Sequence, residues 1–221
     1  MKQTFVFEKQ VEVAGVLKGL ITVPRDFDPK TEALPLIVFL HGAGERGDDV
    51  ERVRVHGIPK LFGSDPDYHG LRVITASPQC PAGMTWNHLA FPLMDWIRAV
   101  AREYNADESR ISICGLSMGG FGTWEMLCTF PDVFCCGAPV CGGGLSWRCS
   151  LLRGQKIRAY HSVDDDAVPF SYSEQMVTGA KANGADIKFF PVDGYGHFSW
   201  IYAFEETDLI EWLAAGGCLE A

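Results

Sequence analysis

The sequence predicts one α/β domain, built on a mostly parallel, twisted sheet of about eight strands with helices on both faces. Its length of 221 residues is enough for one sizeable hydrophobic core and small for two. Strand-like and helix-like segments alternate along the chain, which indicates parallel strands joined by right-handed crossovers. Some strand-like segments are continuously apolar, as in strands covered on both faces. There is no internal repeat, low-complexity tract or linker, so residues 1–221 are expected to form a single domain.

The expected strands follow one another in this order. Residues 5–13 and 16–23 flank Gly15 and predict an opening antiparallel pair. Residues 36–40 form a fully apolar run, which predicts a strand buried on both faces. The remaining strands are expected at residues 72–76, 111–114, 136–141, 156–160 and 187–190.

Helical periodicity fills the intervals between these strands. Residues 89–104 carry apolar side chains at three- and four-residue steps: Leu89, Leu93, Trp96, Ile97, Val100 and Tyr104. Residues 171–182 and 201–214 show a similar helical spacing of apolar residues. These segments are therefore expected to be helices that pack on the sheet.

The composition excludes several classes of protein. Hydrophobic residues make up 47% of the chain and charged residues 21%, as in globular proteins rather than disordered or coiled-coil ones. The net charge is −9, and an acidic chain repels nucleic-acid phosphates and anionic lipids. We therefore expect no nucleic-acid partner and no membrane partner, whereas the sequence leaves a homo-oligomer possible.

The first residues lack the apolar core of a signal peptide. The longest apolar stretch, residues 34–40, is far shorter than the roughly 20 residues of a membrane helix. These features predict a cytoplasmic protein, or a secreted one if a leader has been removed.

The cysteines and histidines show no metal-binding pattern, so neither a metal nor an organic cofactor is expected. The eight cysteines include no Cys-x-x-Cys pair, which disfavours zinc and thioredoxin-like sites. Four of them lie in apolar strand-like runs and are expected to be buried thiols: Cys114, Cys135, Cys136 and Cys141. The adjacent Cys135 and Cys136 are expected on opposite faces of a strand. Three histidines lack metal-ligand spacing and are expected at the surface: His56, His69 and His88.

A Gly-x-Ser-x-Gly motif marks the first candidate site. Gly115, Ser117 and Gly119 follow the expected strand at 111–114 and precede a helical stretch through Leu127. This is the context of a nucleophile elbow, a sharp turn that projects the serine hydroxyl out of the sheet. The glycines are needed because strand and helix approach too closely for a Cβ. The motif alone could equally be a glycine-rich turn with an incidental serine.

A second motif, His41-Gly42-Ala43-Gly44, follows the expected strand at 36–40. This is the predicted position of the second donor of an oxyanion hole. We expect the backbone N–H groups of Met118 and Ala43 to form that hole. His41 itself is interpreted as a structural, hydrogen-bonded histidine rather than a proton carrier.

An acid and a base are expected at the ends of later strands. Three aspartates at residues 164–166 follow the strand at 156–160, and His197 follows the strand at 187–190. The carboxyl ends of parallel strands are where ligands bind in open α/β sheets. This position favours a catalytic role for His197 over a purely structural one.

Together these features resemble a known family. The chain is similar, over about residues 36–213, to compact serine esterases of the α/β-hydrolase superfamily, in the branch of phospholipase/carboxylesterase and prolyl-oligopeptidase-like hydrolases. The order serine, aspartate, histidine along the chain is that of this superfamily. The resemblance is carried by residues 41–47 (HGAGERG), 57–61 (GIPKL), 78–81 (PQCP), 110–124 (RISICGLSMGGFGTW) and 194–197 (GYGH). It implies an α/β-hydrolase fold and a Ser-Asp-His triad.

The resemblance also selects the acid. The family pattern His-Gly-x-x-Asp-x-x-Val-Pro, counted from His161, places it at Asp165, although Ser162 stands where glycine is usual. Asp164 and Asp166 are then expected to be solvated loop charges or helix caps. Because the nucleophile position is Ser117 rather than a cysteine, dienelactone-hydrolase activity is disfavoured.

Four further residues are candidates for substrate contact. The resemblance places Glu45 and Arg46 at the rim of the site, although they could instead tie their loop down. Trp86 could line a pocket for an acyl or aromatic group, or could pack in the core. Trp200, beside His197, leaves the same two possibilities open.

The predicted function is the hydrolysis of carboxylic esters by the triad Ser117, Asp165 and His197. The segment at 142–155, where this superfamily usually inserts a lid, is too short for a helical cap, so an open cleft is expected. The expected substrates are small-molecule or carbohydrate-borne esters with small acyl, acetylated-sugar or feruloyl-type groups. One alternative is a serine peptidase of prolyl-oligopeptidase type, disfavoured because such peptidases carry a large extra domain. The other is a non-catalytic binding protein with a hydrolase fold.

Overall fold

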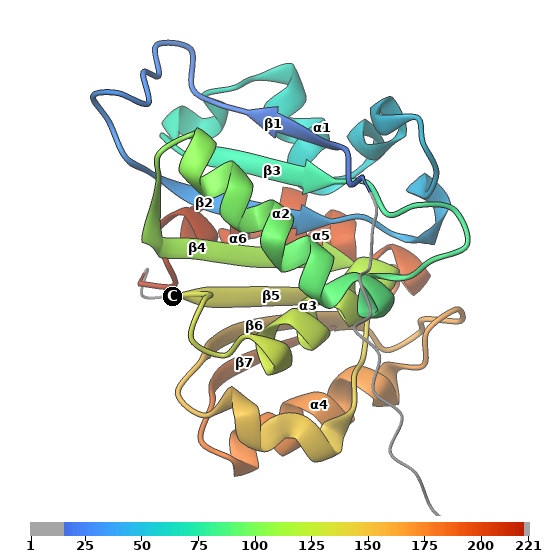
Figure 1. Cartoon of the computed structure of the whole chain (residues 1–221). Coiled ribbons are helices and arrows are strands. Elements are labelled where there is room, and N and C mark those ends of the chain that lie inside the picture. Colours follow the sequence, from blue (N-terminus) through green and yellow to red (C-terminus); the bar gives the residue numbers. More distant parts are fainter. Residues whose placement is uncertain (1–15, 219–221) are drawn as a thin grey trace, which may run out of the picture.

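A computed structural model describes residues 16–218 of the chain (Figure 1). Its centre is a seven-stranded sheet with the strand order β1-β3-β2-β4-β5-β6-β7. The strands are β1 Gly19–Thr22, β2 Leu34–Leu40, β3 Ile74–Pro78, β4 Ala106–Leu116, β5 Cys136–Val140, β6 Lys156–Ser162 and β7 Asp186–Val192. Neighbouring strands are parallel except for β1 and β3, which are antiparallel. The α/β fold class predicted from the sequence is confirmed.

Different helices cover the two faces of the sheet (Figure 1). One face carries α2 Ala90–Glu103, α3 Met118–Thr129 and α4 Phe170–Ala182, and the other carries α1 Gly57–Ser64, α5 Trp200–Glu205 and α6 Leu209–Ala214. Alternation along β2 explains its continuous apolar run, because Leu36 and Val38 pack on the first side and Ile37 and Phe39 on the second.

Short 3₁₀ helices connect these elements and shape the loops at the sheet edges. Within the described residues they are η1 Ala43–Glu45, η2 Val50–Val55, η3 Tyr68–Gly70, η4 Trp86–Leu89, η5 Ser146–Leu152 and η6 Gly196–Phe198. Between β5 and β6 the chain forms only η5, which buries Cys149 and Leu152. Ser117 is half-buried, so this segment is not a helical cap over it.

Some element boundaries differ from the sequence prediction. The expected strand at 5–13 lies outside the described residues, and the segment at 16–23 contributes β1, which pairs with β3. The helix predicted at 201–214 is two helices, α5 and α6. Thr207 causes the break, because its hydroxyl donates to the carbonyl of Ala203 at 2.7 Å and accepts the N–H of Leu209 at 3.2 Å. Helix α1 was not predicted, since Gly57 and Pro59 in its first turn weaken the helical pattern.

All eight cysteines are free thiols, and only Cys218 is exposed. Cys135 and Cys136 were expected on opposite faces of a strand, and this prediction is wrong. Cys135 precedes β5, so the alternation of a strand does not extend to it, and both side chains pack against the same apolar cluster.

No helix between residues 16 and 218 combines the length and the apolar character needed to cross a membrane.

Candidate active site

Ser117 occupies a sharp turn between β4 and α3. Its φ of 53° and ψ of −118° are rare for a residue with a side chain. A Cβ at Gly119 would overlap the carbonyl oxygen of Leu40, and a Cβ at Gly115 would lie 2.5 Å from the carbonyl oxygen of Gly119. The two glycines therefore allow β2, β4 and α3 to close around the strained serine.

Backbone contacts fix Ser117 from both sides. Its N–H donates to the carbonyl of Val140 at 3.0 Å and lies 3.2 Å from Sγ of Cys141, and its own carbonyl accepts the N–H of Phe121 at 3.1 Å. Cys141 has a φ of 40°, so two residues with left-handed backbones lie at the ends of the adjacent strands β4 and β5. Strain of this kind concentrates at functional sites.

His197 links Ser117 to Asp165. Nε2 of His197 lies 2.9 Å from Oγ of Ser117, and Nδ1 lies 2.8 and 3.0 Å from the two carboxylate oxygens of Asp165. With its proton on Nδ1, the ring donates to Asp165 and accepts the serine O–H at Nε2. The side chain of Asp165 is completely buried, whereas that of His197 is 20% exposed. The histidine is therefore open to an incoming ligand, and the aspartate is shielded from one.

Several donors converge on the carboxylate of Asp165. It accepts the N–H groups of Ala167 at 2.9 Å and Val168 at 2.8 Å in addition to His197. Burial raises the pKa of Asp165, but the hydrogen bonds from His197 and these N–H groups outweigh it, so this pKa lies below its usual value. A charged Asp165 stabilises the imidazolium that forms when His197 takes up a proton.

His161 is a second histidine at this carboxylate, and its role there was not predicted from the sequence. Its Nε2 lies 3.1 Å from Oδ2 of Asp165 and 3.0 Å from the carbonyl oxygen of Val168. Because both neighbours are acceptors, Nε2 carries a proton and donates. On the other side of the ring, Nδ1 lies 2.7 Å from Oγ of Ser173 in α4. His161 thus connects the acid to helix α4.

Asp164 is an exposed charge in the loop after β6, as predicted, and it also makes a contact that was not predicted. Its carboxylate accepts the hydroxyl of Ser162 and, at 3.1 Å, the N–H of Gly196. This contact joins the loop that carries Asp165 to the loop that carries His197. The only sequence signal for this contact is that Asp164 directly precedes Asp165. Asp166 is exposed.

The two predicted oxyanion donors lie at turns beside Ser117. Met118 is the first residue of α3, where backbone N–H groups have no partner within the helix. Ala43 begins η1 directly after Gly42, and a Cβ at Gly42 would lie 3.7 Å from Cβ of Ser117. The structure therefore brings both residues into the neighbourhood of the serine hydroxyl.

His41 holds the loop that carries Ala43. The ring is buried, and its Nε2 accepts the N–H of Cys80 at 2.9 Å. Burial lowers the pKa of His41 to about 4, so the ring is neutral at pH 7. These contacts agree with the interpretation of His41 as a structural histidine.

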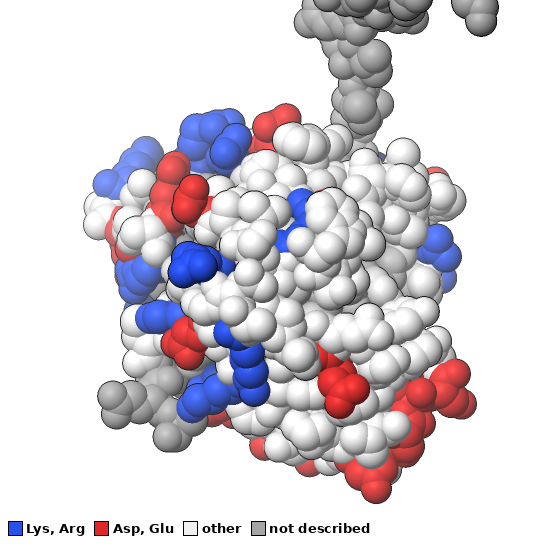
Figure 2. Space-filling model, turned by 90° about the horizontal axis from the view of Figure 1, so that it is seen from below, with Lys and Arg blue, Asp and Glu red and all other residues white. Residues whose placement is uncertain are grey.

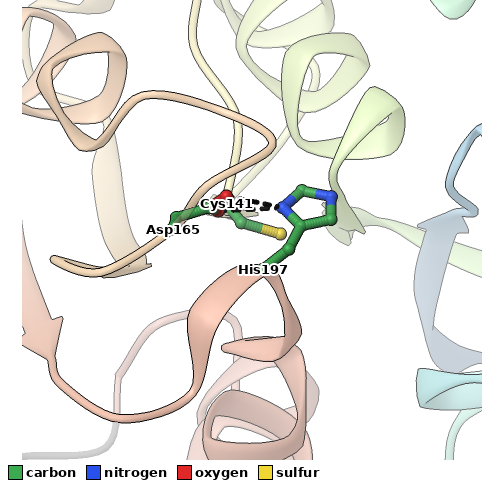
Figure 3. A group of neighbouring side chains, drawn as sticks. All are labelled: Cys141, Asp165 and His197. Atoms are coloured by element: carbon green, nitrogen blue, oxygen red, sulfur yellow. Dashed lines mark hydrogen bonds and ion pairs between the residues drawn. The ribbon is translucent and has the colours of Figure 1, made fainter.

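Cys141 lies beside the Asp165–His197 pair (Figure 3). One potential ligand atom from each of the three residues lies within 4.8 Å of the other two. Such residues can bind zinc, but a cysteine does so as a thiolate, and burial raises the pKa of Cys141 to about 12. Asp165 and His197 also hydrogen-bond to each other, so the arrangement is better suited to proton transfer than to metal binding.

Comparisons with known proteins agree with this geometry. No protein-family model matches the chain, and no curated protein matches it. Among solved structures, a thermostable esterase is 32% identical, with a TM-score of 0.81 over 90% of this chain and 59% of that one. The chain therefore has the α/β-hydrolase fold. It spans less than two thirds of the length of that esterase.

More distant solved structures share the α/β-hydrolase fold. A feruloyl esterase module from Clostridium thermocellum, complexed with sinapinate, is 15% identical, with a TM-score of 0.69 over 90% of this chain and 81% of that one. An acylaminoacyl peptidase from Pyrococcus horikoshii is also 15% identical, with a TM-score of 0.64 over 88% of this chain and 38% of that one. At this identity, the likenesses are evidence of a common fold alone.

Two of the predicted substrate-contact residues are tryptophans, and both are buried. Trp86 is fully buried, donates its indole N–H to the carbonyl of His41 at 3.0 Å and packs against Gly122 of α3. Of the two possibilities predicted for Trp86, the structure therefore shows packing in the core and not the lining of a pocket. Trp200 is 7% exposed, and its ring packs edge-on against His197 with the ring centres 5.4 Å apart. It holds the histidine ring in place.

The other two predicted contact residues belong to the loop after β2. Arg46 donates to the carbonyls of Ala43 at 3.0 Å and Met84 at 3.3 Å, so it ties this loop down. Oε2 of Glu45 lies 3.8 Å from Nδ1 of the neutral His41. A Cβ at Gly42 would lie 3.3 Å from the same oxygen, so Glu45 is close to the turn that carries Ala43. A substrate contact by Glu45 remains a prediction.

Proposed function

We propose that this α/β-hydrolase is a serine esterase that cleaves carboxylic esters through an acyl-enzyme on Ser117. The observation that carries the proposal is the hydrogen-bonded series Ser117–His197–Asp165, with distances of 2.9 and 2.8 Å, on a strained strand-to-helix turn. The esterases among the structural neighbours add support.

In the acylation step, Oγ of Ser117 attacks the ester carbonyl carbon while Nε2 of His197 takes the hydroxyl proton. Asp165 keeps the second proton of the ring on Nδ1 and stabilises the imidazolium. The carbonyl oxygen becomes an oxyanion that accepts hydrogen bonds from the N–H groups of Met118 and Ala43, each worth about 3 kcal/mol. Collapse of this intermediate breaks the bond to the alcohol oxygen, which leaves with the proton from His197.

Deacylation repeats these steps with water. His197 accepts a proton from water as the water oxygen attacks the acyl carbon, and the same two N–H groups bind the second oxyanion. Collapse releases the carboxylic acid and returns the proton to Oγ of Ser117. None of these steps needs a group beyond the side chains and backbone already described.

The uncapped surroundings of Ser117 favour esters with small acyl groups over esters with long acyl chains. The segment between β5 and β6 forms no cap, and His197 is 20% exposed, so a long acyl chain would gain little burial. Small acyl, acetylated-sugar and feruloyl-type esters fit such a site, as small molecules or borne on carbohydrate. One structural neighbour is a feruloyl esterase module, which supports the last of these classes.

The proposal is tested by hydrolysis of p-nitrophenyl acetate and butyrate. We expect Ser117→Ala and His197→Ala to lower kcat by about 10⁴-fold or more, because the two groups act as one unit. Ser64→Ala and His69→Ala are matched controls, since both residues are exposed, and they should retain full activity. Unchanged rates in both site variants would contradict the mechanism and favour a non-catalytic protein.

A peptidase activity is the second candidate, because the structural neighbours include an acylaminoacyl peptidase. It is tested with N-acetyl-alanine p-nitroanilide beside the ester of the same acyl group. The esterase proposal predicts that the ester has the larger kcat/KM. A faster amide reaction would favour the peptidase.

A further inference from the structure

A groove runs along helix α4 and begins beside Phe121, four residues after Ser117. It consists of two adjoining cavities with volumes of about 220 and 600 Å³, and Gln175 lines both. The smaller cavity includes Phe121 and Tyr172, and the larger includes Trp147 and Glu174. The proposed bond-cleaving steps use none of these residues.

The groove begins one helical turn from the serine. Phe121 donates its N–H to the carbonyl of Ser117, and its ring packs edge-on against Tyr172 of α4 with the ring centres 6.2 Å apart. Phe121 therefore connects the turn of Ser117 to the wall of the smaller cavity.

The segment beside the groove is closely packed. Residues 142–144 are glycines that lie against α4, and a Cβ at Gly143 would come within 2.7 Å of Cβ of Tyr172. The hydroxyl of Ser173 donates to the carbonyl of Gly142 at 2.7 Å, which fixes this segment to α4. A preformed wall lowers the entropy cost of binding a ligand.

Large apolar side chains are exposed along this groove. Trp147 is 78% exposed, Leu145 is 54% exposed and Tyr172 is 46% exposed. Single exposed apolar residues are common, but here three line adjoining cavities. Exposed apolar groups that gather in a concave surface are typical of a binding site.

Polar groups lie beside these apolar surfaces. Asn87, Gln175 and Glu125 line the smaller cavity, and Ser146, Glu174 and Thr178 line the larger one. Glu125 is ion-paired with Arg148 at 2.7 Å. Lys and Arg are not among the described residues that line either cavity. Viewed from below, the side on which α4 lies in Figure 1, the molecule shows broad uncharged surface between a basic and an acidic region (Figure 2). This lining disfavours an anionic ligand and suits one with hydroxyl groups to bond and an apolar face to stack.

We propose that the groove binds the sugar part of a carbohydrate-borne ester, with a sugar ring stacked on Trp147 and its hydroxyl groups bonded to Glu174 and Gln175. This inference rests on the proposed esterase function of Ser117, and it assigns the alcohol side of the substrate to the groove. A sugar ring has an apolar C–H face and a polar rim, so it matches both kinds of wall. A fatty acyl chain would form no hydrogen bonds with these amide and carboxylate groups.

Hydrolysis provides the first test. Trp147→Ala should raise KM for an acetylated xylo-oligosaccharide about tenfold and leave kcat/KM for p-nitrophenyl acetate within about twofold. Phe91→Ala is the matched control, because Phe91 is an aromatic residue 69% exposed that lines neither cavity. Phe91→Ala should leave the kinetic constants for both substrates unchanged. The proposal would be overturned if Trp147→Ala lowered kcat/KM equally for both substrates, or if it left KM for the sugar ester unchanged.

Binding without catalysis provides the second test and separates the two proposals. Ser117→Ala is titrated with unacetylated xylotetraose by calorimetry, with Trp147→Ala introduced into the same background. Binding that is lost with Trp147 supports the groove even if the esterase proposal fails. Absence of xylotetraose binding, or binding that Trp147→Ala leaves unchanged, overturns the groove assignment even if Ser117 proves to be the nucleophile.

Discussion

The two sides of the candidate site are held in place by different forces. On the side of Ser117, β2, β4 and α3 approach so closely that only glycine fits at positions 115 and 119. On the side of Asp165 and His197, the loops after β6 and β7 are joined by side-chain hydrogen bonds. The first side should therefore respond to added volume, and the second to the loss of a charge or an acceptor.

The largest expected effect is on the acid–base side. Asp165→Asn keeps the shape of the side chain but removes the charge and can hold His197 in the wrong tautomer, so kcat should fall by about 10⁴-fold. The measurement is ester hydrolysis at pH 7. Asp166→Asn changes the exposed neighbour in the same way and should retain activity. Equal activity in the two variants would remove Asp165 from the mechanism.

On the nucleophile side, Gly119→Ala should act through volume. Its Cβ would overlap the carbonyl oxygen of Leu40 and lie 2.9 Å from that of His41, so the free energy of unfolding should fall by about 3 kcal/mol or more. Urea unfolding measures this change. Gly44→Ala is the control, because a Cβ there has no neighbour within 4 Å, and it should be nearly neutral. Similar stabilities of the two variants would contradict the steric account of the turn.

On the side of Ser117, buried His41 should make the stability of the protein depend on pH. The pKa of buried His41 is about 4, below its ordinary value of 6.5, so at intermediate pH the unfolded chain binds a proton that the folded protein does not. The free energy of unfolding should therefore fall by about 3 kcal/mol between pH 6.5 and 4 through His41. His41→Gln should remove this part of the slope, while exposed His69→Gln should leave it unchanged. A slope equal in wild type and His41→Gln would contradict a neutral, buried His41.

The smallest expected effect concerns the link between the two loops. Asp164→Ala removes the acceptor of the Gly196 N–H, so His197 should be less well oriented and kcat should fall by about tenfold with little change in KM. Asp164→Asn retains a side-chain oxygen and should recover most of the activity. Failure of this rescue would show that the charge of Asp164, rather than its hydrogen bond, is what matters.

The comparison also explains what the sequence could predict. Ser117 with its two glycines, and the strands before it, follow from local rules of chain geometry, so the fold and the position of this turn were accessible. Asp165 and His197 could be located at strand ends, and the structure brings them within hydrogen-bond distance of each other and of Ser117.

The supporting contacts could not be predicted because they depend on segments far apart in sequence. Asp164 binds Gly196 of another loop, and His161 bridges Asp165 to Ser173 of α4. The role of Trp86 could not be decided for the same reason, since only the tertiary packing of η4 against α3 determines whether its ring faces a ligand or the core. The division of α5 from α6 likewise depends on the hydroxyl contacts of Thr207.

The most direct test of the esterase proposal is covalent labelling of Ser117. Treatment with paraoxon should place one diethyl phosphoryl group on the peptide that contains Ser117, and ester hydrolysis should be lost in proportion to labelling. Peptide mass spectrometry and residual activity on p-nitrophenyl acetate measure the two quantities. Labelling of a different residue, or full hydrolysis after Ser117 is completely labelled, would contradict the account.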